Sequence, residues 1–317
     1  MELLFLVLLS LLTVKTATEG KEEWCYHSQL CTHPACAEPR LWNTVNEECG
    51  KQNQSPINIV TNKVEYKGDL KPFIFEGYDS KESPPWTIEN NGHTVKISLT
   101  GAAKIGAGGL QNKYKAMEFH FHWGSSVREE YSPGSEHSID GERYAMELHI
   151  VHIKEGFSST TEAVKDKHGL AVLAFFIETG AENENYASLI EKLNEIVYKG
   201  TKTNMEALPL ESLIPDKETL KGYYRYNGSL TTPNCYEAVV WTIFKKPIIL
   251  SKSQVKNFWE KLYFTEDTTL NMTDNFRPVQ PLNGRIVYSS DVNVIQPPAK
   301  ALLVVPTLIY LMIPLFQ

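Results

Sequence analysis

The segment 118–123, Glu-Phe-His-Phe-His-Trp, constrains the fold of this chain more than any other stretch. Aromatic residues fit a pleated, half-buried surface, so the segment favours a β-strand. Because side chains alternate between the two faces of a strand, His120 and His122 lie on one face and the three aromatic side chains on the other. Two imidazoles on one face can share a metal ion. The alternative is a polar strand face that only meets solvent.

A second strand-like run, Glu147-Leu148-His149-Ile150-Val151, supplies a third imidazole. The same alternation puts Glu147, His149 and Val151 on one face of that strand. Zinc is usually bound tetrahedrally, and three neutral histidines leave its fourth position open for water. That arrangement is typical of catalytic rather than structural zinc. His120, His122 and His149 are therefore the candidate ligands of a Zn²⁺ ion.

The N-terminal end of the 317-residue chain reads as a targeting signal. Residues 2–14 are nearly all apolar and are followed by small residues, which predicts a secretory signal peptide over residues 1–20. The start is atypical because it carries Glu2 and no basic residue. An uncleaved membrane anchor is the alternative, but the apolar run is short for a membrane span.

The C-terminal tail, residues 301–317, is also apolar, and no basic residue follows it. Upstream lie the small residues Ser289 and Ser290 and a spacer. This order is the pattern of a glycosylphosphatidylinositol (GPI) attachment signal, which predicts attachment at Ser289 or Ser290 and a propeptide over residues 290–317. A single-pass C-terminal helix is the alternative, and two prolines in the tail disfavour it.

The remaining residues, 21–289, are enough for one domain with its own core. The net charge of −7 is modest and no basic stripe is present, which argues against a nucleic-acid partner. Five cysteines suit an oxidising compartment, but the odd number leaves at least one outside intrachain pairs, and spacing alone does not fix the pairing. Sequons begin at Asn227 and Asn271. We prefer Asn271 as the glycosylation site, because Asn227 lies close in sequence to Thr231.

Periodicity predicts the secondary structure. Short alternating runs with turn signals predict an antiparallel, sheet-dominated fold after residue 54. Residues 170–177 are continuously apolar, which suits a strand buried on both faces. Apolar residues at helical spacing predict helices over 185–197 and 251–262, the second capped by Ser251 or Ser253. We also expect a strand over 239–244 and an irregular segment over 22–50.

The turn Asn91-Gly92-His93 places a histidine between two strand-like runs. At such a turn it is either an exposed polar residue or, at the mouth of a site, a proton carrier.

Several motifs resemble, in the same order along the chain, those of the α-class carbonic anhydrases. The motifs that carry the resemblance are Gln54-Ser55-Pro56-Ile57-Asn58-Ile59, Asn90-Asn91-Gly92-His93, Phe119-His120-Phe121-His122-Trp123, Ser135-Glu136-His137-Ser138-Ile139, Glu147-Leu148-His149-Ile150-Val151, Gly228-Ser229-Leu230-Thr231-Thr232-Pro233 and Asn275-Phe276-Arg277-Pro278. Within that family, the signal peptide, the cysteines and the tail look most like the membrane-anchored type-four or type-fifteen forms.

The resemblance implies an α+β, mostly β single domain. Its large, twisted, mainly antiparallel central sheet would carry small peripheral helices and a conical zinc cleft. His120, His122 and His149 match the zinc ligands, Thr231 and Glu136 the pair that orients a zinc hydroxide, and His93 the proton shuttle. Glu147 matches the partner of His149. The residues that match the substrate-binding wall are Val151, Val172, Leu230, Thr231, Thr232, Val239 and Trp241.

The resemblance also implies a function. It predicts a carbonate dehydratase, a zinc lyase that reversibly hydrates carbon dioxide to bicarbonate and a proton by zinc-hydroxide attack with proton shuttling. Sulfonamide-type inhibitors and a monomeric state are expected. The disulfides implied are Cys25–Cys36 and Cys49–Cys235, with Cys31 left over. The enzyme would be a GPI-anchored glycoprotein on the extracellular face of the plasma membrane.

One position departs from the family pattern, since Glu118 stands where glutamine is usual. Glu118 shares a strand face with His120, and a carboxylate that accepts from the imidazole N–H makes the ligand more basic. We therefore expect an activity profile shifted to alkaline pH. The alternative is an exposed carboxylate with little influence.

Two other functions fit parts of the sequence. A catalytically silent carbonic-anhydrase-like domain could serve as a surface binding module, although silent members usually lose a zinc histidine. A zinc-binding surface protein without catalysis would need neither Thr231 nor His93.

Overall fold

A computed structural model describes residues 24–29, 36–81, 84–127 and 130–291. The predicted signal peptide, Cys31 and the tail beyond Asp291 lie outside the described residues. None of the helices in the described ranges is long and apolar enough to cross a membrane.

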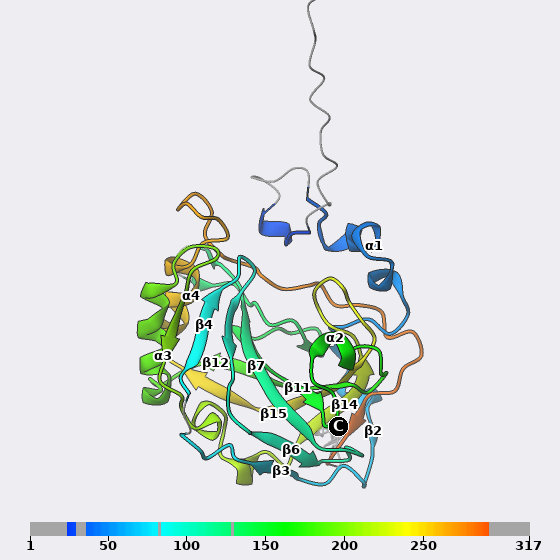
Figure 1. The fold of residues 1–317 in the computed structure, drawn as a ribbon. Helices are drawn as coiled ribbons and strands as arrows, with labels where there is room; N and C mark the ends of the chain where they lie inside the picture. The colour runs from blue at the N-terminus through cyan, green and yellow to red at the C-terminus, as the bar shows by residue number, and fades with distance from the viewer. Residues whose placement is uncertain (1–23, 30–35, 82–83, 128–129, 292–317) are drawn as a thin grey trace, which may run out of the picture.

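The described chain is built on a large mixed sheet with the strand order β13-β4-β5-β7-β11-β12-β15-β14-β16-β2 (Figure 1). In addition, β6 pairs with β7, and β3 pairs with β6. Two short two-stranded sheets pair β1 with β10 and β8 with β9. The strands are β1 Asn58–Ile59, β2 Glu65–Tyr66, β3 Phe73–Glu76, β4 Trp86–Asn90, β5 Val95–Ser98, β6 Lys104–Ala107, β7 Tyr114–Trp123, β8 Ser126–Val127, β9 Glu130–Tyr131, β10 Ser138–Ile139, β11 Met146–Lys154, β12 Leu170–Thr179, β13 Lys202–Met205, β14 Tyr223–Gly228, β15 Val239–Leu250 and β16 Tyr288–Ser289.

Most neighbours in the main sheet are antiparallel, as predicted, while β12 pairs with β15 and β16 with β2 in parallel. Strand β12 has the continuous apolar sequence of residues 170–177, and all of those residues are buried. A strand covered on both faces needs apolar side chains on both, which is why this segment lacks alternation.

The two faces of the central strands pack into separate cores. On β7, the aromatic side chains of Phe119, Phe121 and Trp123 are completely buried in the larger core. On the other face, Val172 of β12 and Trp241 of β15 belong to a smaller core. The histidines of β7 and β11 project on this second face, so the sheet itself supplies the floor of their site.

Helices are few and short, and Figure 1 places α3 and α4 on the same flank of the sheet, where α4 contacts η6, the turn that follows α3. The α-helices are α1 Trp42–Val45, α2 Thr160–Ala163, α3 Ala187–Lys192 and α4 Lys252–Lys261. The 3₁₀ helices are η1 His27–Gln29, η2 Pro39–Leu41, η3 Glu47–Gly50, η4 Thr61–Lys63, η5 Glu184–Tyr186, η6 Leu193–Glu195, η7 Leu210–Leu213 and η8 Lys217–Thr219.

The two predicted helices differ in outcome. Helix α4 begins as predicted after Ser251, whose hydroxyl accepts from the amide of Gln254 while the Gln254 side chain accepts from the Ser251 amide. The predicted helix over 185–197 is helical up to Glu195, but only α3 is α-helical and the 3₁₀ turns η5 and η6 flank it. At its end, the Asn194 side chain donates to the carbonyl of Glu191 and competes with the backbone for that acceptor.

The segment expected to be irregular, residues 22–50, instead contains α1 and short 3₁₀ turns in its described part. Its completely buried Trp42 donates its indole N–H to the carbonyl oxygens of Cys25 and Ala37. A disulfide joins Cys25 to Cys36. A large buried side chain and a crosslink therefore order a segment that has little periodicity of its own.

Candidate functional site: a cluster of three histidines

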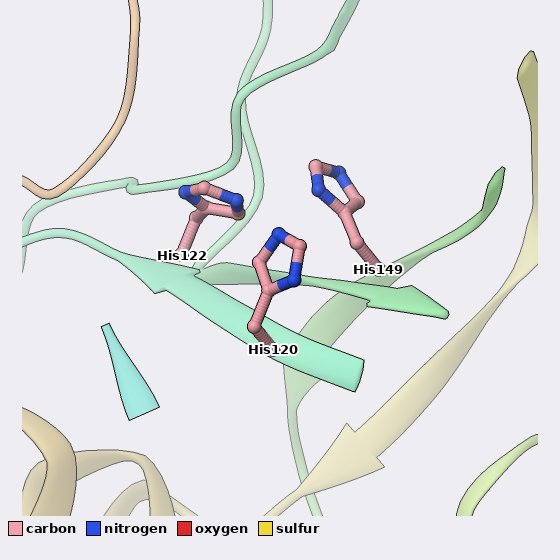
Figure 2. Close-up of side chains that lie close together, drawn as sticks. All are labelled: His120, His122 and His149. Atoms are coloured by element: carbon pink, nitrogen blue, oxygen red, sulfur yellow. The ribbon is translucent and has the colours of Figure 1, made fainter. Parts of the chain in front are cut away.

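Strands β7 and β11 bring the three histidines together. His149 of β11 pairs in register with His120 of β7, and Glu147 pairs with His122. The ring centroids lie 5.1 Å apart for His120 and His122, 5.2 Å for His120 and His149, and 4.7 Å for His122 and His149. One nitrogen from each ring lies within 4.8 Å of the other two. Figure 2 shows the rings projecting from the two strands into one common space.

Each histidine has an acceptor on the ring nitrogen that faces away from its neighbours. The Nδ1 atom of His120 lies 3.1 Å from both carboxylate oxygens of Glu118. Nδ1 of His122 lies 2.8 Å from the carbonyl oxygen of Asn275, and Nε2 of His149 lies 2.6 Å from Oε1 of Glu147. Since these partners only accept, each of these nitrogens carries the proton. The other ring nitrogen keeps its lone pair, and this is Nε2 in His120 and His122 but Nδ1 in His149.

His122 and His149 are held neutral by burial. Burial lowers the pKa of His122 well below its usual value, and it lowers the pKa of His149 to about 4. The His120 side chain is more accessible than the other two, with 19% of its surface exposed, so the cluster opens to solvent on that side. Nε2 of His122 is buried without a hydrogen-bond donor among the described residues. An unprotonated, buried nitrogen of this kind is what a metal ligand requires.

The carboxylate of Glu147 connects two histidines. Oε1 accepts from His149 and also lies 2.7 Å from Nδ1 of His137, while Oε2 accepts from the His137 amide at 2.8 Å. Burial alone would raise the pKa of Glu147, but the interactions with His137 and His149 outweigh it and hold the pKa well below its usual value. A charged Glu147 fixes the orientation of His149.

Neither His137 nor its second partner, Tyr226, was assigned from the sequence. Its Nε2 lies 2.7 Å from the hydroxyl of Tyr226, which in turn donates to the hydroxyl of Ser55 at 2.8 Å. The one available signal was the position of His137 next to Glu136 in a motif already singled out. Asn275 was also missed. Its backbone oxygen holds His122, its side-chain oxygen accepts from the Trp123 amide, and its side-chain nitrogen donates to the carbonyl of His93.

Glu136 lies beside the cluster and is completely buried. Its Oε2 is 3.4 Å from Nε2 of His122, and its Oε1 accepts from the Arg277 amide at 2.8 Å. Burial raises the pKa of Glu136 to about 8, while hydrogen bonds from the Arg277 amide and the Thr231 hydroxyl lower it. A cation bound by the histidines would favour the ionised carboxylate further.

The apolar residues assigned to the substrate wall lie together on this side of the sheet. Val151, Val172, Val239 and Trp241 are buried members of the smaller core, and Leu230 packs against it. The Trp241 ring lies 4.8 Å from the His149 ring, and its indole N–H donates to the carbonyl of Ser229 at 3.0 Å. Thr232, next to Thr231, is half-buried.

His93 occupies the turn between β4 and β5 and is half-buried. Its ring stacks on the indole of Trp24, with centroids 3.9 Å apart and an interplanar angle of 13°. The N-terminal segment that carries the Cys25–Cys36 disulfide therefore forms one side of the His93 environment.

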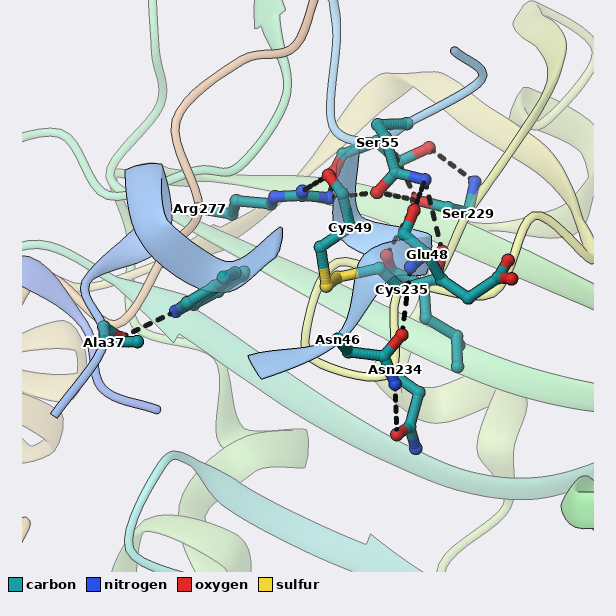
Figure 3. The surroundings of a disulfide bond; sticks show 12 residues. Ala37, Asn46, Glu48, Cys49, Ser55, Ser229, Asn234, Cys235 and Arg277 are labelled. Atoms are coloured by element: carbon teal, nitrogen blue, oxygen red, sulfur yellow. Dashed lines mark hydrogen bonds between the residues drawn. A yellow bond between two sulfur atoms is a disulfide. The ribbon is translucent and has the colours of Figure 1, made fainter. Parts of the chain in front are cut away.

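The second disulfide joins Cys49 to Cys235 (Figure 3). Both disulfides are the pairs that the resemblance implied. Cys235 follows Thr231 and Thr232 in a loop, and its amide donates to the Thr232 carbonyl at 2.7 Å. On the other side, the Arg277 guanidinium donates to the carbonyl oxygens of Cys49 and Ser55. The loop that carries Thr231 is thus fixed to the N-terminal part of the domain.

The two sequons differ in their surroundings. Asn227 is exposed near the end of β14, whereas the exposed Asn271 donates its side-chain amide to the carbonyl oxygens of Trp259 and Glu260 at the end of α4. Near the end of the described chain, Ser289 is buried in β16, and the hydroxyl of Ser290 donates to the carbonyl of Lys221 at 2.8 Å.

Comparison with known proteins agrees with this geometry. A model of the eukaryotic-type carbonic anhydrase family matches residues 37–291. The chain is 43% identical over 310 residues to carbonic anhydrase 4 of Oryctolagus cuniculus, with 97% of each chain covered. It is 38% identical to carbonic anhydrase 15 of Mus musculus, covering 90% of this chain and 89% of that one, and 36% identical to carbonic anhydrase 12 of Homo sapiens, covering 78% and 70%. The chain therefore belongs to the family of eukaryotic-type carbonic anhydrases.

Proposed function

We propose that this carbonic anhydrase hydrates carbon dioxide reversibly at the outer cell surface and uses one Zn²⁺ ion held by His120, His122 and His149. The observation that carries the proposal is the set of three acceptors, Glu118, Asn275 and Glu147, that fix which nitrogen of each ring keeps its lone pair. Three neutral imidazole donors suit zinc in a catalytic site. When bound there, zinc would lower the pKa of a ligated water to roughly 7 and so supply hydroxide near neutral pH.

Thr231 and Glu136 would orient the nucleophile. When ionised, Glu136 can only accept, so the Thr231 hydroxyl would donate to it and leave its own oxygen as an acceptor toward the histidine cluster. An acceptor in a fixed direction holds the nucleophile's proton and points its lone pair elsewhere. The Arg277 amide supports this role, because it keeps Glu136 in place at 2.8 Å.

The remaining assigned residues suit substrate and proton handling. Carbon dioxide is nonpolar and would be held by the buried face formed by Val151, Val172, Val239 and Trp241. Charged bicarbonate would find no favourable contacts on this apolar face and would be released. His93 would carry the released proton to solvent, because a half-buried imidazole at a turn can exchange protons with water.

Several features support an extracellular location. Two disulfides are typical of proteins that fold in an oxidising compartment. The predicted signal peptide and the predicted GPI signal after Ser289 or Ser290 would place a monomeric enzyme on the outer leaflet, open to sulfonamide-type inhibitors. The chain also retains all three histidines, Glu136 and Thr231, which a silent binding module would not need.

The test is the rate of carbon dioxide hydration by the full chain produced in animal cells, with zinc measured on the same sample. We expect about one zinc per chain, activity that a chelator abolishes and zinc restores, and release from cells by a phospholipase specific for GPI anchors. A folded, zinc-loaded but inactive protein would instead identify a binding module. Activity that survives complete removal of zinc would refute the metal assignment.

A further inference from the structure

A wide groove with a strongly basic lining lies on the face of β14 and β15 that points away from the histidines. Tyr226 and Trp241 face the histidine site, so Arg225 and Thr242 of the same strands face the opposite side. The groove has a volume of about 930 Å³, and its lining includes seven lysine or arginine side chains but only two carboxylates, Glu48 and Glu237. This balance contrasts with the net charge of −7 for the whole chain.

Arg225 forms part of the floor of this groove and is only 7% exposed. Its Nε and Nη2 atoms donate to the Thr242 hydroxyl, and Nη2 also donates to the carbonyl of Gly108. The guanidinium lies 5.6 Å from the ring of Tyr223. No carboxylate forms an ion pair with it anywhere in the described chain. Burial lowers the pKa of Arg225 to about 10, so it still carries its charge at neutral pH.

A buried guanidinium without a carboxylate is unusual, because buried charges are normally paired. The remaining donor, Nη1, borders the groove beside Gly109, where a Cβ would lie 3.5 Å from it. The same Cβ would lie 2.7 Å from Cδ2 of Leu70, so the Leu70 side chain packs beside the guanidinium at this edge of the groove. The charge and the open donor together are suited to an anion that comes from outside the chain.

Other cations surround this floor. Tyr114 donates its hydroxyl to the carbonyl of His168 at 2.7 Å, which brings the loop with Lys165 and Lys167 next to Arg225. Lys67 lies over the ring of Tyr288 on another wall. Of the other lysines in the groove, Lys51 pairs with Glu48 and Lys154 with Asp166. No ion pair among the described residues involves Lys67, Lys165 or Lys167.

We propose that this groove binds a phosphate group, with Arg225 as the buried donor and Lys67, Lys165 and Lys167 as surrounding cations. The phosphate could belong to a phospholipid headgroup or be free in solution. The headgroup source rests on the proposed membrane attachment, because Tyr288 lines the groove and directly precedes Ser289 and Ser290. The phosphate site itself does not depend on that attachment or on the proposed catalysis.

The experiment titrates the full chain with inorganic phosphate by calorimetry at low salt, and separately sediments it with vesicles of phosphatidylcholine alone or with phosphatidic acid. The variants are Lys67→Glu/Lys167→Glu, which changes exposed groove residues, and Arg225→Gln. Lys252→Glu, an exposed lysine on α4 with no ion pair among the described residues, is the matched charge control. His120→Ala removes the candidate metal site and hence any anion that binds there.

We expect phosphate to bind with a dissociation constant of about 1 mM. Its binding should weaken at least tenfold in the double lysine variant and stay unchanged in Lys252→Glu and in His120→Ala. Co-sedimentation with the phosphatidic acid vesicles, lost in the same variants, would identify the headgroup as the source. Phosphate binding without such sedimentation would identify the free ion. Binding that survives the lysine changes, or that disappears only in His120→Ala, would overturn the proposal. The double lysine variant keeps the test decisive if Arg225→Gln fails to fold.

Discussion

Both carboxylate oxygens of Glu118 lie 3.1 Å from Nδ1 of His120. The two residues share a face of β7, as the alternation of the strand predicts, so Glu118 is not a remote surface carboxylate. A charged acceptor at this position makes the imidazole a stronger electron donor than a neutral amide would.

Replacing Glu118 by Gln should therefore shift the pH profile of carbon dioxide hydration to lower pH. We expect a shift of roughly one pH unit, the scale on which surroundings commonly move side-chain pKa values in proteins. The measurement is the midpoint of kcat/KM against pH. Glu89→Gln is the matched control, because Glu89 lies on β4 and its carboxylate pairs with Lys96 rather than with a histidine. An unmoved midpoint in Glu118→Gln would show that the carboxylate has no influence.

Thr231→Val should lower kcat/KM by roughly a hundredfold, as expected when an orienting contact is lost at a reacting centre. Valine has nearly the same shape but cannot donate to Glu136 or accept from the nucleophile. Zinc content and thermal stability should stay close to those of the parent protein, which separates orientation from metal loss. Thr219→Val, at an exposed threonine in η8, serves as the control. Equal losses in the two variants would argue against a specific role for Thr231.

The unfolding free energy should fall in acid because of His152. Its Nε2 lies 2.6 Å from the hydroxyl of Tyr78, and burial lowers its pKa from 6.5 to about 4. Between these values the unfolded chain binds a proton that the folded chain does not, so stability is lost as pH falls from about 6.5 to 4. The difference corresponds to about 3 kcal/mol. Urea unfolding of the parent and of His152→Gln at pH 7 and pH 4 checks this. The variant should lose less stability over the interval, and an identical loss would contradict the assignment.

Removing the Cys49–Cys235 disulfide by changing both residues to Ser should cost about 2–5 kcal/mol of unfolding free energy. This bond spans 186 residues, whereas Cys25–Cys36 spans 11, and a longer closed loop restricts the unfolded chain more. The matched Cys25→Ser/Cys36→Ser variant should therefore be less destabilised. Thermal unfolding of both variants gives the comparison. A larger loss in the Cys25/Cys36 variant would mean that native contacts, rather than loop length, dominate.

The sequence predicts best what depends on local pattern. Alternation identified the histidine faces of β7 and β11, and the continuous apolar run identified the buried strand β12. Ser251 marked the start of α4. The predicted helix over 185–197 begins and ends in 3₁₀ turns. Hydrophobic spacing does not reveal this, because it contains no information on the side-chain hydrogen bond of Asn194.

The contacts that complete the site were beyond local pattern. Asn275 holds His122 across 153 residues, and Arg277 holds Glu136 across 141. No periodicity relates such positions, because tertiary packing alone brings them together. The disulfide pairing was likewise undetermined by cysteine spacing and came only from family resemblance. The basic groove was invisible for the same reason, since its lysines are scattered along the chain.

These long separations also set an order of events during biosynthesis. The three histidines emerge from the ribosome more than a hundred residues before Asn275, which holds His122, and Arg277, which holds Glu136. Until these two residues arrive, the orientation of His122 and the position of Glu136 are not fixed. A correctly oriented histidine cluster therefore forms only after nearly complete synthesis of the domain.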